Sequence, residues 1–250
     1  MFYLAKNQLS GQAQAMPQGK RLDWSSRFAF LAEASKHPSL KAFYQHGVVA
    51  ASTPIADVPL VALDFETTGL DPRRDSIVSI GLVPMTISRI RCNGARHWVI
   101  KPETRLHSSS VMIHGITHSV VEDAPEFSTI IDTLLAHLQG KTVVVHYSAI
   151  ERRFLHAALM RHIQEGIEFP VIDTMEIEAR YTRTWRQTLW NGLMGRQPSS
   201  IRLTDSRTRY HLPYYRQHHA LTDALACGEL LQAQCATHFT PSTPLSALWS

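Results

Sequence analysis

Cysteine is scarce in this sequence, and long apolar runs are missing. The three cysteines, Cys92, Cys227 and Cys235, are odd in number and show no C-x-x-C spacing, which argues against a disulfide framework and against a thiolate zinc site. No apolar run approaches the ~20 residues that span a membrane, and the N-terminus lacks the apolar core of a secretory signal. We therefore expect a cytoplasmic protein that has no membrane partner.

Several common catalytic motifs are also absent. The sequence has no G-x-S-x-G and no H-E-x-x-H, and the Gly-Lys-Thr at residues 140–142 lacks the P-loop glycine five residues earlier. These absences leave carboxylates and histidines as the side chains for any chemistry.

What is present is the composition of a folded globular protein. Of the 250 residues, 44% are hydrophobic and 18% are charged, which is enough apolar surface for a core. The length suits one substantial domain with an appendage. We predict a helical extension and linker over residues 1–56, a compact domain over 57–236 and a tail over 237–250.

Hydrophobic periodicity divides the chain into helices and strands. Helical patterns cover 24–34 and 40–44 in the extension, and 125–140, 149–163 and 220–234 beyond it. Short runs rich in β-forming residues predict five strands, at 59–65, 76–85, 95–102, 141–147 and 169–173. Successive strands followed by alternating helices and strands predict an α/β fold, with a mixed five-stranded sheet flanked by helices.

Two carboxylates end the first predicted strand. Asp64 and Glu66 stand two residues apart, so both point to the same face of the strand while Phe65 points to the other. Paired carboxylates in this position form a half-site for a hard cation such as Mg²⁺, which prefers oxygen ligands. Two solvated acids at the end of a strand explain the fragment equally well.

A third carboxylate, Glu151, lies on the apolar face of the helix predicted over 149–163. Phe154 and Leu155 follow it at helical spacing on that face. A carboxylate that points toward a core is rarely left unpaired, so we expect either a metal ion or an arginine partner.

The sequence His218-His219-Ala-Leu-Thr-Asp223 supplies the remaining candidates. Positions five apart do not share a helical face. His218 is therefore predicted on the loop that enters the last helix, and Asp223 in the first turns of that helix. A cap or surface histidine is the alternative for His218.

Together, these motifs resemble the DEDD superfamily of 3′–5′ exonucleases, in the subclass with a catalytic histidine. The matching segments are DFETTGL (64–70), VMIHGIT (111–117), VHYSAIERRFL (145–155) and HHALTDA (218–224), within a stretch of roughly 57–235. The resemblance implies a ribonuclease H-like sheet and hydrolysis of DNA or RNA from the 3′ end, releasing nucleoside monophosphates.

The resemblance also implies roles for individual residues. Two divalent cations, Mg²⁺ or Mn²⁺, would be held by four carboxylates, and His218 would be the general base. Thr67 and His114 would lie near the terminal nucleotide. The carboxylates are Asp64, Glu66, Glu151 and Asp223.

At one position the sequence departs from that family. The family pattern is H-N-A-x-F-D, where this chain has His-Tyr-Ser-Ala-Ile-Glu at residues 146–151. Glu151 keeps the negative charge but adds one methylene, about 1.5 Å of reach. We expect activity to survive this change.

Positive charge gathers in one segment. Residues 180–216 hold eight arginines, Arg180 and Arg183 among them, against one acid, so the segment carries +7 and the rest of the chain −3. Tryptophans and tyrosines alternate with the arginines. Such a mixture suits single-stranded nucleic acid, because arginines neutralise phosphates and aromatic rings stack on bases. The alternative is an insertion whose aromatic residues pack on the domain.

Three functions therefore compete. The first is an exonuclease on the 3′ end of DNA or RNA, with repair, proofreading and RNA trimming all open. The second is an enzyme of the same chemistry that degrades very short oligonucleotides, for which a long basic segment is unnecessary. The third is a non-catalytic nucleic-acid-binding module, in which Glu151 has disabled the metal site. The N-terminal extension, residues 1–56, either docks the enzyme to a protein partner or packs on the sheet.

Overall fold

The computed structural model describes residues 22–104, 112, 115–183, 194 and 197–250. Within these residues a six-stranded sheet has the order β3-β2-β1-β5-β6, with β4 also paired to β2. None of the described helices is long and apolar enough to cross a membrane. The strands are β1 (Leu60–Thr67), β2 (Ile77–Thr86), β3 (Arg89–Ile90), β4 (Arg96–Val99), β5 (Thr142–Val145) and β6 (Val171–Asp173).

The sheet is mixed, as the sequence predicts. Strand β2 runs antiparallel to β1, β3 and β4, whereas β1, β5 and β6 are parallel. The predicted count of five strands is wrong by one, because the sequence pattern does not predict β3. This strand has only two residues, which pair with Met85 and Thr86 of β2, and two residues are too few to show a period-two pattern.

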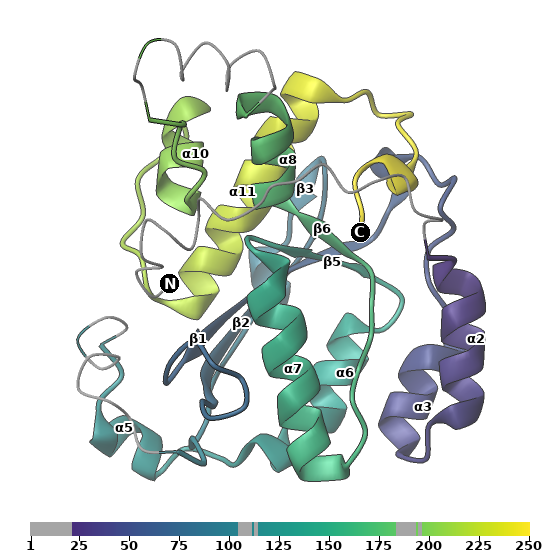
Figure 1. Ribbon diagram of the computed structural model, residues 1–250, viewed down its shortest axis with the longest axis vertical. Helices are drawn as coiled ribbons and strands as arrows, with labels where there is room; N and C mark the ends of the chain where they lie inside the picture. The colour runs from purple at the N-terminus through teal and green to yellow at the C-terminus, as the bar shows by residue number, and fades with distance from the viewer. Residues whose placement is uncertain (1–21, 105–111, 113–114, 184–193, 195–196) are drawn as a thin grey trace.

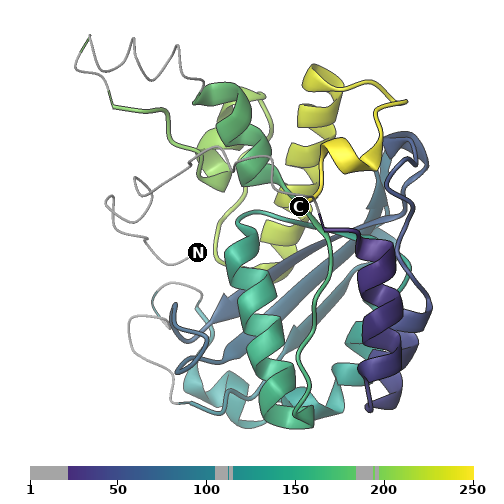
Figure 2. The same cartoon turned by 45° about the vertical axis from the view of Figure 1, so that its right-hand side comes forward.

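Each face of β1 packs against a different set of helices. Val61 and Leu63 join the core formed with α6 (Ile131–Leu138) and α7 (Ser148–Ile163), while Leu60 and Ala62 join the core formed with α11 (Ala220–His238). Alternate residues of a strand point to opposite faces. The sheet is therefore covered on both sides, with α7 in front of it in Figures 1 and 2.

The described part of the N-terminal extension belongs to the same core. Helix α2 (Trp24–Ala34) begins after Asp23, whose carboxylate caps it, and α3 (Pro38–Gln45) packs beside α2 and against α6. Phe28 and Phe43 are buried in the cluster that holds Val61. The helix predicted over 24–34 is thus confirmed, and the boundary at residue 56 does not separate two hydrophobic cores.

Several elements were not predicted from the sequence. They are α5 (His118–Glu122), α8 (Thr174–Thr182), α10 (Leu203–Arg209) and the short 3-10 turns η1 (Ile55–Asp57), η2 (Cys92–Gly94), η3 (Phe127–Thr129) and η4 (Leu245–Ala247). These elements are at most nine residues long, which leaves little periodicity to detect. The helix predicted over 125–140 begins only at Ile131, after η3.

A close contact at Gly81 positions the start of α11. Gly81 pairs with Asp64 across the β1–β2 ladder, and a Cβ added to it would lie 2.2 Å from the backbone of Ala220. The backbone of α11 therefore approaches the sheet as closely as glycine permits.

We predict that Gly81→Ala destabilises the protein by about 1–3 kcal/mol, because the added methyl meets backbone rather than a flexible side chain. Gly94→Ala is the matched control, since its Cβ would meet only the Pro84 side chain, at 3.2 Å. Urea denaturation measures both free energies of unfolding. Equal stability of the two variants would contradict the close contact at Gly81.

Candidate active site

The first two carboxylates continue the face of β1 that packs against α11. Asp64 is partly buried and Glu66 is buried, while Phe65 points into the opposite core. Across the ladder they face Gly81 and Ser79. These small partners leave space above the strand, and the entry to α11 uses that space.

The entry to α11 brings His218 and Asp223 to this strand end. His218 has a left-handed backbone, with φ at 69°, and His219 caps the helix by accepting from the amide of Thr222. The amide of His218 donates to Asp223 Oδ2 at 2.8 Å. His218 thus lies on the entry loop and Asp223 in the first turn, as the spacing predicts.

Three of these side chains form one compact group. Glu66, His218 and Asp223 each place a potential ligand atom within 4.8 Å of the other two. Two oxygen donors and one nitrogen donor converge there from strand and helix entry, which is the arrangement of a candidate metal centre.

Glu151 lies in the first turn of α7, and only 2% of its surface is exposed. Among the described residues its Oε2 has no hydrogen-bond partner, and it forms no ion pair with an arginine. The arginine partner considered from the sequence is therefore not found in the described part of the chain. A buried carboxylate oxygen without a partner is costly unless a cation satisfies it.

The four carboxylates interact electrostatically. Burial, followed by the charges of Asp223, Glu66 and Glu151, raises the pKa of Asp64 well above its ordinary value. Burial and the Asp223 charge raise the pKa of Glu66 from 4.5 to about 7. Burial likewise raises the pKa values of Glu151 and Asp223. A donor set whose own charges repel in this way fits divalent cations, because a cation reverses the repulsion.

A fifth acid, Asp173, holds the start of α7 in place. From the end of β6 it accepts from the amides of Tyr147 at 3.0 Å and Ser148 at 2.7 Å, and it also caps α8. Tyr147 has φ at 88°, a left-handed conformation that tyrosine adopts at a cost and asparagine tolerates better. Asp173 thereby fixes the turn that presents Glu151.

Sequence reasoning missed Asp173, although a signal was available. An Asp-Thr pair directly after an apolar strand is a typical helix N-cap. The second pair of bonds, to the turn before α7, has no signature in the sequence because Tyr147 and Asp173 belong to different elements.

A family model for exonucleases, RNase T, matches residues 61–231. This chain belongs to the RNase T exonuclease family. The match includes every candidate carboxylate described above and, apart from the first residue of β1, every described strand.

Curated relatives include DNA polymerase III proteins. The chain is 33% identical to the PolC-type DNA polymerase III of Thermotoga maritima over 121 residues, which is 48% of this chain and 9% of that protein. It is 34% identical to the epsilon subunit of Rickettsia felis over 100 residues, 40% of this chain and 43% of that subunit. The exonuclease chain thus spans less than half the length of these relatives.

Solved structures share the fold of this exonuclease. The nuclease domain of 3′hExo, a DEDDh family member bound to rAMP, matches with a TM-score of 0.60 at 15% identity, over 76% of this chain and 96% of that one. Exonuclease X, in complex with 5′ overhanging duplex DNA, matches with a TM-score of 0.54 at 23% identity, over 74% and 97%. At these identities the likeness supports the ribonuclease H-like fold alone.

Three of the four residues predicted to contact the substrate lie in the described part of the exonuclease. Thr67 is buried at the end of β1, and its hydroxyl donates to the carbonyl of Gly69 at 2.6 Å. Arg180 donates to the carbonyl of Ala247 at 3.0 Å, and Arg183 to that of Ser199 at 3.2 Å. His114 lies outside the described residues.

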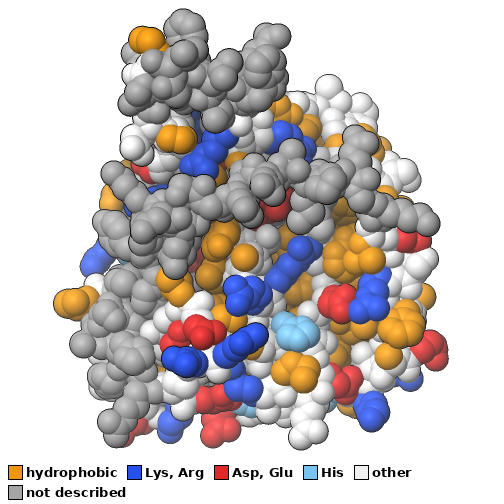
Figure 3. All heavy atoms as spheres, in the orientation of Figure 1, with side chains coloured by type: hydrophobic (Ala, Val, Ile, Leu, Met, Phe, Trp, Pro, Cys, Tyr) orange, Lys and Arg blue, Asp and Glu red, His pale blue; other side chains and the backbone are white. Residues whose placement is uncertain are grey.

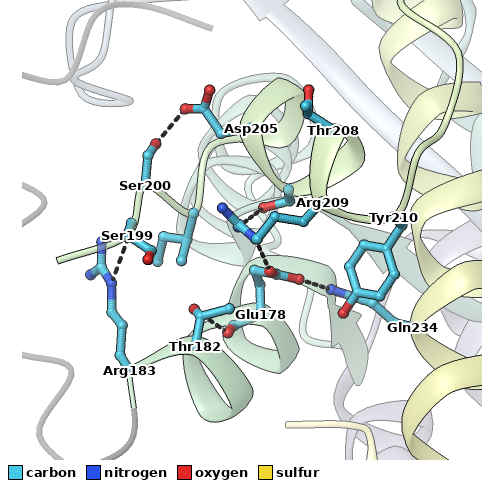
Figure 4. A network of polar contacts seen from close by, with 12 residues as sticks. Glu178, Thr182, Arg183, Ser199, Ser200, Asp205, Thr208, Arg209, Tyr210 and Gln234 are labelled. Carbon is cyan, nitrogen blue, oxygen red and sulfur yellow. Dashed lines mark hydrogen bonds and ion pairs between the residues drawn. The ribbon is translucent and has the colours of Figure 1, made fainter. Parts of the chain in front are cut away.

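Much of the described basic segment is used inside the exonuclease fold. Arg207 is buried and pairs with Glu229 at 2.7 Å. Figure 4 shows Arg209 bonded to the buried Glu178, which also accepts from Gln234 of α11 at 2.9 Å. These bonds tie α8, α10 and α11 together. Helix α10 is therefore packed on the domain. Arg186, Arg196, Trp185 and Trp190 lie outside the described residues.

The raised pKa of Glu66 predicts a pH dependence of stability in chelator. Well below pH 4.5 the Glu66 carboxyl is neutral in both the folded and the unfolded chain. As pH rises from 4.5 through about 7, this carboxyl ionises more easily in the unfolded chain. The free energy of unfolding therefore falls by up to about 3 kcal/mol. Glu66→Gln should reduce this slope in urea denaturation, whereas the exposed Glu33→Gln should keep it. The slope that remains in Glu66→Gln comes from the other buried carboxylates, whose pKa values are also raised. Parallel pH profiles for wild type and Glu66→Gln would refute this assignment.

Asp173→Asn should destabilise the protein by about 2–3 kcal/mol, because an amide replaces a carboxylate that accepts four backbone N–H groups. Asp23→Asn, at a cap that serves α2 alone, should cost less than 1 kcal/mol. Thermal denaturation ranks the two variants. A loss at Asp173 no larger than at Asp23 would mean that the clamp on Tyr147 and Ser148 contributes nothing.

Proposed function

We propose that this chain is a metal-dependent 3′–5′ exonuclease that releases nucleoside monophosphates from the 3′ end of DNA or RNA. One observation carries the proposal. In a chain of an exonuclease family, Glu66, His218 and Asp223 converge within 4.8 Å, and the charges of Glu151 and Asp223 act on Asp64 beside them.

Four carboxylates would hold two divalent cations, Mg²⁺ or Mn²⁺. They are Asp64, Glu66, Glu151 and Asp223. Their oxygen donors suit hard cations, and the buried Oε2 of Glu151 has no described hydrogen-bond partner. When bound, a pair of such cations would supply the positive charge that activates water and stabilises the leaving oxygen of an in-line displacement.

His218 would accept the proton of the attacking water. Imidazole is the side chain best suited to accept a proton near neutral pH. Its loop position lets it approach from outside α11, while the bond from its amide to Asp223 Oδ2 fixes it relative to the donor set. The proton acceptor and the carboxylates would then face the same site from different directions.

The proposed substrate is the 3′ end of a single strand. Thr67, at the end of β1, and His114 would contact the terminal nucleotide, and Arg180 and Arg183 would contribute positive charge farther along. The names of the relatives and fold neighbours, which mention DNA polymerase III and bound nucleotide or DNA, support a nucleic-acid substrate.

The proposal also covers the division of the chain into domains. Residues 57–236 would form the exonuclease domain, and residues 1–56 would dock a protein partner. The polymerase context of the relatives named above gives this docking role its support.

The direct test incubates purified protein with end-labelled single-stranded DNA, RNA and a dinucleotide, each in Mg²⁺, Mn²⁺ or excess chelator. We expect stepwise shortening from the 3′ end with either cation and none in chelator. Cleavage restricted to the dinucleotide would favour the oligonucleotide-degrading alternative. Undiminished hydrolysis in chelator would refute the metal-dependent mechanism.

Variants at Glu151 and His218 distinguish the proposed metal ligand from the proposed general base. Glu151→Gln keeps the size but removes the charge, so turnover and Mg²⁺ affinity should both collapse while the fold persists, because carboxylate repulsion is relieved. His218→Ala should lower the rate by roughly 10²–10⁴ and leave Mg²⁺ affinity largely intact. Single-turnover rates across a Mg²⁺ titration measure both quantities.

Glu151→Asp asks whether the backbone has adjusted to the longer side chain. Lower activity than wild type would show that aspartate falls short of the cations, and equal or higher activity would show that it reaches them. Wild-type turnover of Glu151→Gln at limiting Mg²⁺ would remove Glu151 from the proposed ligand set.

A further inference from the structure

A second concave surface lies on the outer side of α7. It is a cleft of about 870 Å³ between α7, α2 and the connection from β1 to β2. Its lining includes Trp24 of α2, Arg73 of the connection, and Arg153 and Met160 of α7. Figure 3 shows basic side chains gathered among apolar ones over α7, in the middle of that face.

The cleft offers unpaired positive charge. Arg73 and Arg153 are exposed, and neither side chain has a hydrogen bond or ion pair to any described residue. Among the described lining residues Glu168 is the only acid, and Arg27 neutralises it, with its Nη2 2.5 Å from Glu168 Oε1. An anionic ligand would therefore meet cations that are free to pair with it.

Two further arginines hold the walls of the cleft. Arg152 donates to the carbonyl of Phe169 at 2.9 Å. Arg161 donates to the carbonyl of Pro72 at 2.9 Å and pairs with Glu103 at the same distance. These bonds tie the β1–β2 connection and the segment before β6 to α7, so the walls are fixed in the absence of a ligand.

The lining also provides apolar surface. Met160 is 44% exposed, and Trp24, Ala157 and Phe169 line the same space. Trp24 and Phe169 are only 9% and 1% exposed, so Met160 and Ala157 provide most of the accessible apolar surface. Free arginines beside such a surface suit single-stranded nucleic acid, because the phosphates meet the cations and the flat bases meet the apolar groups. An acidic peptide would use the charge but not the apolar floor.

The cleft begins close to the candidate active site. Arg152 and Arg153 directly follow Glu151 in α7, and successive residues rotate by about 100°, so Glu151 and Arg153 lie on opposite sides of a helix roughly 10–12 Å wide. A strand bound at both the carboxylates and the cleft would pass around the start of α7. Trp24 belongs to the extension, so this wall of the cleft lies outside residues 61–231, which the family model matches.

We propose that the cleft formed by Trp24, Arg73, Arg153 and Met160 binds the single-stranded part of the substrate upstream of its 3′ end. The site rests on the proposed exonuclease function for its occupant and extends that function with a specificity: it favours strands long enough to span both sites. Very short oligonucleotides reach only the carboxylates.

The test compares two double variants of equal charge change. Arg73→Ala with Arg153→Ala removes the free cations of the cleft, and Arg89→Ala with Arg91→Ala removes two exposed arginines at the β3 edge. Fluorescence anisotropy measures binding of labelled 20-nucleotide and 4-nucleotide single-stranded DNA in chelator, between 50 and 200 mM salt. Melting temperatures check that each variant is folded.

We expect the cleft variant to bind the 20-mer roughly 10- to 30-fold more weakly at ~0.1 M salt, with a salt slope smaller by roughly 1.4, because each phosphate contact on a single strand contributes about 0.7. Binding of the 4-mer should not change, and the control pair should bind the 20-mer like wild type. Met160→Glu, which places an acid in the cleft, should weaken 20-mer binding as well.

Equal 20-mer affinity and salt slope for the cleft variant and wild type would overturn the proposal. So would a cleft variant that loses binding to polyglutamate but not to DNA, since the cleft would then accept an acidic protein segment. Hydrolysis assays separate this failure from failure of the exonuclease function. If the cleft alone is wrong, the variant and wild type shorten the 20-mer with the same KM and kcat, whereas if the exonuclease function is wrong, neither hydrolyses it.

Discussion

Repulsion among buried carboxylates is the constraint around which this structure is arranged. Asp64, Glu66, Glu151 and Asp223 gather at one end of β1, and burial raises the pKa values of all four. The charge of Asp223 adds to this effect at Asp64 and Glu66. Such a group is unfavourable in a core by itself. The group persists because packing and hydrogen bonds elsewhere in the fold hold the backbone that carries these carboxylates.

Two features of the scaffold supply that restraint. The missing side chain at Gly81 lets α11 approach the sheet closely enough to bring Asp223 beside Glu66. Asp173 ties the turn before α7 to the start of α8, which fixes the direction of Glu151. Both act on helix starts, where a small backbone shift moves a side chain relative to its neighbours. The carboxylates are therefore preorganised for the cations that we propose they hold.

The parts of the chain outside the strands and central helices have different roles. Helices α2 and α3 complete the core behind α6 and contribute Trp24 to the cleft on α7. In the basic segment, Arg207 and Arg209 bind Glu229 and Glu178, so a high density of arginine there reflects internal ion pairing as well as exposed charge. Arg73 and Arg153, which pair with no acid in the described part of the chain, lie outside this segment.

Four features could be predicted from the sequence: the mixed sheet, the shared face of Asp64 and Glu66, the inward direction of Glu151, and the positions of His218 and Asp223 at the last helix. These follow from local rules, because strand alternation and helical rotation fix which side chains share a face. Only the tertiary structure decided the convergence of Glu66, His218 and Asp223, the clamp by Asp173, the sixth strand and the cleft on α7. Each of these depends on contacts between elements far apart in the chain, and local periodicity carries no information about which distant backbones approach closely enough to touch.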